Sequence, residues 1–190
     1  MNAVICIAAG KSQIPIILKA KSLGYAVIAI DQNKKAPGFK FADFKILKST
    51  FDIDEIIKEI KKLIKKYKIQ GILNRSSGPP VIVSAKLSKF LKLDGVPVQS
   101  AKILLNKDKM RSFCKKKNIP TPNFKIFSNN KFKESNNQHF PVVFKPSLSL
   151  KGKKGITIVR SKKILSKAVK YAEKNTINNK ILMEDFLDGP

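Results

Sequence analysis

The residues of this sequence that are best suited to chemistry lie in a strand–loop–strand pattern between residues 140 and 159. Residues 140–146 and 156–159 are rich in β-branched and aromatic side chains, which predicts two strands. Lys145 lies near the end of the first strand, and Gly152 and Gly155 lie in the loop that follows. Backbone N–H groups of a glycine-containing loop bind phosphate oxygens, and a neighbouring ammonium adds the opposite charge. The pattern predicts a phosphate site, but an ordinary surface hairpin with a lysine-rich tip has the same pattern.

The charge of the chain favours anionic partners in general rather than a specific nucleic-acid reader. The formal net charge of the 190 residues is +26, and only Arg75, Arg111 and Arg160 among the 39 basic residues are arginines, so 36 are lysines. Specific readers favour the arginine fork, and these lysines form no basic arm and no aromatic-spaced stripe along the sequence. An AT-rich coding bias and selected polyanion binding both account for them. We expect no specific nucleic-acid partner.

The composition argues against several other classes of site. His139 is the only histidine, which disfavours histidine-based triads and multi-histidine metal centres. Cys6 and Cys114 have no Cys or His at metal-ligand spacing and are expected to be core thiols. No apolar run approaches the roughly 20 residues of a membrane span. We therefore expect a cytoplasmic protein with no membrane partner and no metal ligands in this chain.

The first hundred residues alternate strands with helices, which predicts the α/β class and a doubly wound parallel sheet of Rossmann-like type. Polar loops follow the strands at Asp31 and at residues 74–78, where open α/β sheets bind ligands. Residues 10–12 copy the end of a P-loop, but the first required glycine is replaced by Ile5, and a dinucleotide fingerprint would need more glycines than Gly10. Strands are expected at 3–8, 25–30, 44–47 and 69–73, with helices ending near 23, 67 and 91.

The second half has a different pattern and ends abruptly. A helix at 106–117 and a Pro-rich linker at 118–122 precede the strand–loop–strand pattern. Because the chain ends on an apolar strand and turn at 180–190, we expect an interrupted fold. Further elements are expected at 124–127 (strand), 161–174 (helix) and 180–184 (strand).

Four segments, taken in order, resemble the ATP-grasp superfamily, in particular the branch of biotin carboxylase, the carbamoyl-phosphate synthase large subunit and related carboxylate–amine ligases. Asp31 with residues 36–43 is similar to an acidic strand end and "APGF…AD", and residues 108–122 resemble "DKxxxR…GIPTP". Residues 141–155 resemble "PVVVKP…GSKGV", and residues 181–190 resemble "ilvEeFleGpE". The resemblance implies a pre-ATP-grasp substrate domain at 1–104. It also implies the first α+β subdomain of an incomplete ATP-grasp nucleotide-binding domain at 105–190, truncated after the strand that contacts adenine.

The resemblance also implies a set of ATP-binding residues. Two ammonium groups would contact the phosphates, a flexible loop would close over them, and the last strand would bind adenine through Glu184 and through the backbone. The implied residues are Lys109 and Lys145 for the phosphates, Gly152, Lys154 and Gly155 for the loop, Glu184, Asp185 and Leu187 for the adenine edge, and Phe144 and Met183 as apolar walls.

The chain departs from the family pattern in ways that bear on function. Its phosphate loop is one residue longer, Leu148 and Leu150 replace small residues, Asn118 replaces a glycine, and Arg111 comes early. The Mg²⁺ ligands of the family are expected beyond residue 190.

The resemblance thus implies the ATP-binding portion of a ligase that activates a small carboxylate as an acyl phosphate for attack by an amine or thiol. We expect this portion to be inactive alone, with no catalytic residues of its own, unless a second chain supplies the missing half. A non-catalytic nucleotide or polyanion binder that uses its lysine-rich surface is the alternative.

Overall fold

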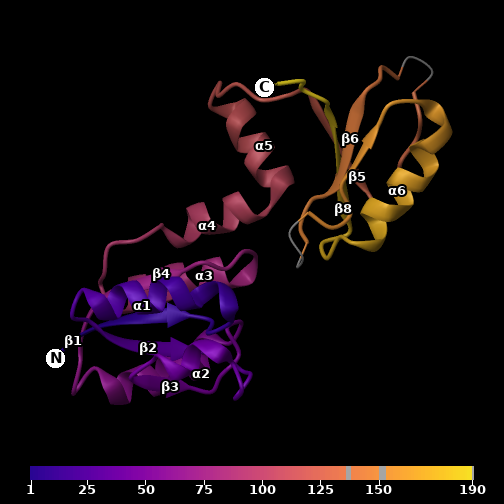
Figure 1. Cartoon of the computed structure of the whole chain (residues 1–190). Helices are drawn as coiled ribbons and strands as arrows, with labels where there is room; N and C mark the ends of the chain where they lie inside the picture. Colours follow the sequence, from indigo (N-terminus) through magenta and orange to yellow (C-terminus); the bar gives the residue numbers. More distant parts are fainter. Residues whose placement is uncertain (136–137, 150–152, 190) are drawn as a thin grey trace. The chain divides into compact units, whose positions relative to one another are not determined.

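The computed structural model describes residues 1–135, 138–149 and 153–189. The chain forms two compact units, Met1–Ala101 and Lys102–Pro190, and each is built on a four-stranded sheet (Figure 1). The first sheet is parallel and the second is antiparallel. The α/β class expected from the sequence is therefore confirmed.

The first unit has strand order β3-β2-β1-β4. Polar loops leave the carboxyl ends of β1, β2 and β4, as the sequence predicts. The elements are β1 (Asn2–Ile7), a 3₁₀ turn (Lys11–Gln13), α1 (Ile14–Ser22), β2 (Ala26–Ile30), a second 3₁₀ turn (Pro37–Lys40), β3 (Phe44–Ile46), α2 (Ile53–Leu63), β4 (Lys68–Asn74) and α3 (Pro79–Phe90).

Helices cover both faces of this parallel sheet, which is why its strands are apolar on both sides. Ile5 of β1 lies in a core cluster with Ile60 of α2 and Leu87 of α3. Its neighbour Cys6 points to the other face, where it packs with Ile17 of α1. The doubly wound arrangement is thus confirmed. Burial raises the pKa of the Cys6 thiol to about 12.

The second unit has strand order β5-β8-β6-β7, and every neighbouring pair is antiparallel. Figure 1 shows α6 along one face of this sheet and α5 on the other side. The apolar face packs on α6, with Val142, Phe144 and Val159 against Leu165 and Val169. The elements are α5 (Lys107–Lys116), β5 (Phe124–Ser128), β6 (Val142–Pro146), β7 (Thr157–Val159), a 3₁₀ turn (Lys162–Ile164), α6 (Leu165–Lys174) and β8 (Lys180–Asp185).

One helix was not expected from the sequence. Helix α4 (Val98–Leu105) begins directly after Pro97, whose carbonyl accepts a hydrogen bond from the Ala101 N–H at 3.0 Å. Its only fully buried residue is Ala101, so its apolar periodicity is weak and gave no helical signal. Among the described helices, none has the length and apolar character needed to cross a bilayer.

Candidate functional site

Lys145 and Glu184 lie on the sheet face of the second unit that is turned away from α6. Successive strand residues point to opposite faces, so Phe144 and Met183 face α6 and are buried in its core cluster. The expectation that Phe144 and Met183 form apolar walls for the base is therefore wrong, since both pack in the core with α6. Strand register places Val143, which lies two positions before Lys145, beside Glu184 on one side and Ile158 on the other. Val143 and Ile158 are apolar side chains that share the face of Lys145.

Glu184 is the centre of an ion-pair cluster that joins three elements. The residue is 4% exposed, and its carboxylate accepts hydrogen bonds from Arg111 Nε at 2.6 Å and Arg111 Nη2 at 3.1 Å. It also accepts one from Lys145 Nζ. Burial acts to raise the pKa of Glu184, but the hydrogen bonds and charges of Arg111 and Lys145 outweigh it and lower that pKa. The carboxylate is therefore held ionised between two cations.

Lys107 adds a third cation to this cluster, and it was not among the residues expected from the sequence. Its ammonium is half-buried, and its pKa is lowered by burial first and then by repulsion from Lys145, with only partial compensation from Glu184. In the described part of the chain, Lys107 forms no ion pair. The site thus has three cations and one carboxylate, and this surplus positive charge is suited to an anionic ligand.

Lys109, the lysine expected at the phosphates, lies elsewhere on α5. Its side chain is exposed, and no hydrogen bond or ion pair of it is found among the described residues. Residues four apart share a helix face, whereas residues two apart do not. Because Arg111 docks on Glu184, Lys107 faces the cluster and Lys109 points away from it. Lys107 lies four residues before Arg111, and this spacing was the signal in the sequence that could have identified it.

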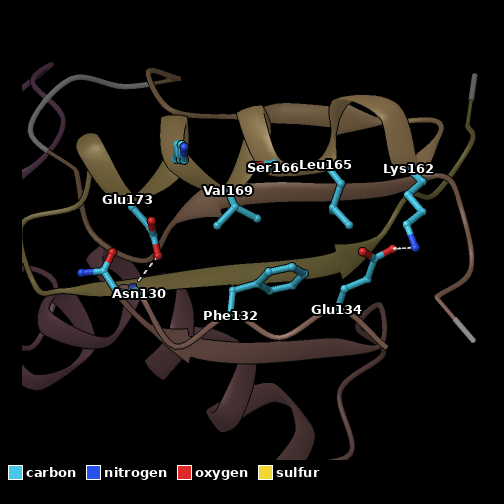
Figure 2. Close-up of a pocket in the computed structure, with 9 residues that line it drawn as sticks. Asn130, Phe132, Glu134, Lys162, Leu165, Ser166, Val169 and Glu173 are labelled. Carbon is cyan, nitrogen blue, oxygen red and sulfur yellow. Dashed lines mark hydrogen bonds and ion pairs between the residues drawn. The ribbon is translucent and has the colours of Figure 1, made fainter. Parts of the chain in front are cut away.

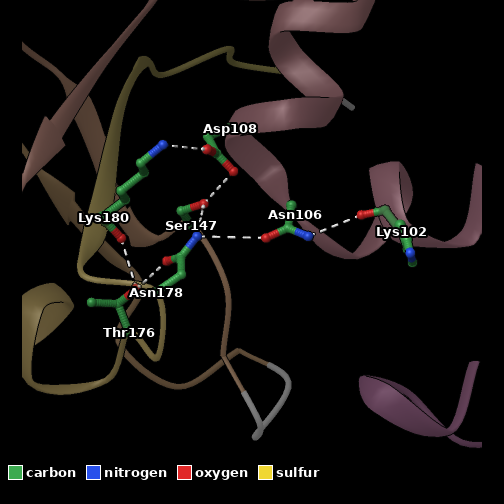
Figure 3. Close-up of polar contacts among 7 residues, drawn as sticks. All are labelled: Lys102, Asn106, Asp108, Ser147, Thr176, Asn178 and Lys180. Atoms are coloured by element: carbon green, nitrogen blue, oxygen red, sulfur yellow. Dashed lines mark hydrogen bonds and ion pairs between the residues drawn. The ribbon is translucent and has the colours of Figure 1, made fainter. Parts of the chain in front are cut away.

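A second polar network holds the beginning of α5 against the strands (Figure 3). The Ser147 hydroxyl, fully buried, donates to Asp108 Oδ1 at 2.6 Å and accepts from Asn178 Nδ2 at 3.1 Å. Lys180 Nζ lies 3.4 Å from Asp108 Oδ2. Burial acts to raise the pKa of Asp108. Hydrogen bonds from the Ser147 hydroxyl, the Lys109 backbone and Lys180 outweigh burial and lower that pKa. The Lys107 N–H also donates to the Ser147 carbonyl at 2.9 Å, so the network fixes Lys107 beside the strand that contains Lys145.

The loop expected to close over phosphate is described only at its end. Gly152 lies outside the described residues, and Lys154 is exposed in a turn that ends at Gly155. Gly155 has a φ of +84°, and a Cβ placed there would lie 2.5 Å from Pro146 Cγ and 2.8 Å from Asn175 Cβ. Gly155 is therefore a buried anchor of the loop, required by both its backbone conformation and its close packing.

We expect Gly155→Ala to destabilise the second unit by about 2–5 kcal/mol, because left-handed backbone costs about 1–2 and overpacking about 1–3. Gly24→Ala is the matched control in the first unit, since Gly24 has a φ of +81° and a Cβ added there would meet no atom within 4 Å. Gly24→Ala should lower the free energy of unfolding only by the cost of the left-handed backbone, about 1–2 kcal/mol. Amide exchange in urea, followed separately in each unit, measures both; equal losses would contradict the packing role of Gly155.

The segment expected to contact adenine leaves β8 with its backbone only partly used. The Asp185 N–H donates to the Asn123 carbonyl at 3.0 Å, and the Phe186 N–H donates to the Pro141 carbonyl at 3.2 Å. Leu187 is 67% exposed, and no partner of its N–H is found in the described ranges. Leu187 therefore offers a backbone donor to a ligand, whereas the N–H of Asp185 is already bonded.

The carboxyl-edge loops of the first unit form their own polar cluster. Asp31 accepts hydrogen bonds from the Ala9 N–H and the Asn33 N–H, both at 2.9 Å. Arg75 Nη1 donates to the Ser12 carbonyl at 2.9 Å, which ties the loop after β4 to the loop after β1. These contacts order the edge where the sequence predicts substrate.

A cavity of about 360 Å³ lies on the α6 side of the second sheet (Figure 2). Phe132, Leu165 and Val169 form its apolar lining, and the Glu134–Lys162 ion pair, 3.1 Å long, bounds one end. None of the residues expected to bind ATP lines it. Since Lys145 and Glu184 are on the other sheet face, this cavity is not part of their site.

Comparison with known proteins identifies the family of the second half of the chain. Residues 106–190 match the family model described as "Carbamoyl-phosphate synthase L chain, ATP binding domain". Residues 106–190 belong to the ATP-grasp superfamily. The matched range contains Lys107, Arg111, Lys145 and Glu184, so the whole ion-pair cluster lies in the ATP-grasp part of the chain.

Individual relatives match almost the whole length of the chain. Formate-dependent phosphoribosylglycinamide formyltransferase from Prochlorococcus marinus strain MED4 is 32% identical over 197 residues, covering 97% of this chain and 47% of the relative. The same enzyme from strain MIT 9515 is 28% identical over 194 residues, with the same two coverages. The chain thus spans about half the length of the curated relatives it matches.

Solved structures show the same ATP-grasp fold. N5-carboxyaminoimidazole ribonucleotide synthetase from Thermotoga maritima has a TM-score of 0.67 at 23% identity, covering 98% of this chain and 46% of that one. An L-amino acid ligase from Bacillus licheniformis has a TM-score of 0.71 at 23% identity, covering 100% and 45%. At these identities the likeness concerns the fold alone.

The described residues of this chain do not fit a resident magnesium site. Among the described residues, no group of three or more His, Cys, Asp or Glu is placed to hold a metal ion. The one carboxylate of the cluster, Glu184, is already bonded to Arg111 and Lys145. We therefore derive no chemical step through a metal on this chain.

Proposed function

We propose that this chain binds ATP through Lys107 and Lys145 and supplies the nucleotide-binding portion of an ATP-grasp ligase. The observation that supports this most directly is the surplus charge of the Glu184 cluster, three cations around one carboxylate in a half-buried setting. Cations that are partly removed from water and repel each other gain most from an anionic ligand. A triphosphate provides several oxygens for such contacts.

The remaining contacts to the nucleotide follow from the same sheet face. Val143 and Ile158 offer apolar contact to the adenine base. The Leu187 N–H offers a hydrogen-bond donor to the edge of that base. We propose that Glu184, while bonded to Arg111 and Lys145, also accepts a hydrogen bond from the adenine amino group. The turn at Lys154 and Gly155 brings the loop back towards Pro146. We assign nucleotide binding to residues 105–190 and substrate binding to residues 1–104.

We propose that the reaction served by this site is activation of a carboxylate. A carboxylate oxygen attacks the terminal phosphorus of ATP, ADP leaves, and the resulting acyl phosphate is attacked by an amine, with release of phosphate. The relatives named as formate-dependent phosphoribosylglycinamide formyltransferases suggest formate as the carboxylate and a phosphoribosyl amine as the acceptor. The polar loops near Gly10, Asp31 and residues 74–78 are the proposed place for the acceptor.

Turnover requires groups that this chain's described residues do not provide. Phosphoryl transfer depends on metal ions that offset developing charge, and the cationic Glu184 cluster offers no ligands for one. We propose that Mg²⁺ is held by protein outside residues 1–190, either further along the same polypeptide or in a second chain. The 190 residues alone are then expected to bind ATP without hydrolysing it.

The test is the affinity of the chain for ATP, measured by calorimetry at low and high salt. Lys145→Ala should weaken binding roughly tenfold or more, since a charge-assisted hydrogen bond contributes about 1.5–3 kcal/mol. Lys163→Ala, which removes an exposed lysine of the 3₁₀ turn before α6, is the matched control and should change little. Equal losses for the two variants, together with collapse of binding at high salt, would instead indicate diffuse attraction to the lysine surface.

A further inference from the structure

A second basic site lies on the first unit, at the edge of its sheet where the strands begin. This edge is marked by the N-terminus in Figure 1 and is opposite to the polar loops proposed for substrate. A cavity of about 310 Å³ opens there between the ends of α2 and α3 and the start of β4. We call it the basic–aromatic pocket; it is lined by Ile64, Tyr67, Lys68, Ile69, Phe90, Leu91 and Lys92.

Lysines surround this pocket without acidic partners. Lys61 Nζ lies 6.0 Å from the centre of the Phe90 ring, and Lys66 Nζ lies 5.6 Å from that of Tyr67. Within the described residues, Lys61, Lys66, Lys68 and Lys92 form no ion pair. Other lysines on or before α2 do have carboxylate partners, as Lys48 and Lys58 share Glu55, and Lys62 pairs with Glu59. Among the described residues, the pocket is therefore bordered by lysines that have no carboxylate partner.

The exposed apolar side chains distinguish this pocket from ordinary helix ends. Lysines near helix C-termini stabilise the helix dipole, which accounts for basic residues after α2 and α3. It does not account for Phe90 and Ile64, which are 37% and 43% exposed beside them. An aromatic ring, an apolar neighbour and unpaired ammonium groups around one small cavity are the features that bind a base and its phosphates in single-stranded nucleic acids.

We propose that the basic–aromatic pocket binds single-stranded nucleic acid without sequence preference. One base enters the cavity against Phe90 and Ile64, and the flanking phosphates contact Lys61, Lys66 and Lys92. The pocket shares no residue with the Lys145 site, since all its residues belong to the first unit. They come from the opposite edge of that sheet from Asp31. The function is therefore additional to ATP binding and does not depend on it.

The test measures binding of a fluorescent oligouridylate to the full chain by anisotropy over a range of salt. The pocket variant carries Lys61→Gln, Lys66→Gln and Lys92→Gln; the matched control carries Lys163→Gln, Lys167→Gln and Lys174→Gln near and along α6. Both lose the same charge. The pocket variant should bind at least tenfold more weakly, with the salt slope reduced by about 2, because each lost phosphate contact removes about 0.7. The control should lose less than about threefold.

Phe90→Leu tests stacking with the charge unchanged. It should weaken oligouridylate binding about fivefold or more and leave ATP binding unaltered, while Lys107→Ala should leave oligouridylate binding unaltered. Thermal unfolding of each variant checks that the first unit remains folded. Equal losses in the two triple variants, no effect of Phe90→Leu in a folded protein, or equal binding of a base-paired duplex would each overturn the proposal.

Discussion

Lys107→Ala is expected to lower the affinity of the chain for ATP roughly 10- to 150-fold, the value of one charge-assisted contact to a phosphate. The reason is that Lys107 is half-buried, has no carboxylate partner of its own among the described residues, and is repelled by Lys145. A phosphate oxygen relieves that repulsion, so the contact is stronger than that of a solvated lysine. Calorimetric titration with ATP measures the change.

Lys109→Ala is the matched control, because it removes the same side chain two residues along the same helix. Lys109 is exposed and faces away from Glu184, so its loss should alter ATP affinity less than about threefold, as for an exposed charge pair. If Lys109→Ala proves the more damaging substitution, the assignment of Lys107 is wrong and the expectation drawn from the sequence is correct. Lys107→Arg should retain most of the affinity, since it keeps the charge.

Glu184→Gln is expected to destabilise the second unit by about 3 kcal/mol, the lower end of the range for breaking a buried ion pair. The substitution keeps the shape of the side chain but leaves Arg111 and Lys145 facing each other without a counter-ion. Their side chains are only 20% and 14% exposed, so water compensates little of the loss. Urea denaturation, with amide exchange in β6 and β8 as the local readout, measures the change.

Glu55→Gln is the control for that experiment, because Glu55 also accepts two cations, Lys48 and Lys58, but at the surface. We expect no resolvable shift in the unfolding midpoint. Acid provides an independent check on Glu184. Because its pKa is lowered in the folded chain, the stabilisation is complete above the ordinary glutamate pKa of about 4.3 and is lost as the pH falls through the folded value. A Glu184→Gln variant whose acid sensitivity equals that of the unchanged protein would argue against the role of Glu184.

The fold was largely predictable from apolar periodicity. The strands of the first unit are continuous apolar runs such as residues 26–30, and these are buried on both faces as in parallel sheets generally. Alternation in β6 also predicts which side chains share a face. Lys145 and Phe144 are neighbours, so one faces the ligand and the other the core, and the sequence alone excluded Phe144 as a wall of the same site.

The site was predictable only in part, because it depends on which face of α5 meets the sheet. That face is fixed by the contact between Arg111 and Glu184, residues 73 apart in the chain. Local propensity gives no information on such a pairing. The basic–aromatic pocket has the same origin, since Tyr67 and Phe90 come from different elements and become neighbours of the same cavity only after folding.

The position of Glu184 has a consequence for how long a nucleotide stays bound. Its carboxylate acts as an internal substitute for phosphate, holding Lys145 in place when no ligand is present. An arriving nucleotide must share that ammonium with the protein, which limits the net gain on association, and on departure the lysine returns to a ready partner. We therefore expect rapid exchange of nucleotide at this site, so that spent ADP is released without a large rearrangement of the sheet.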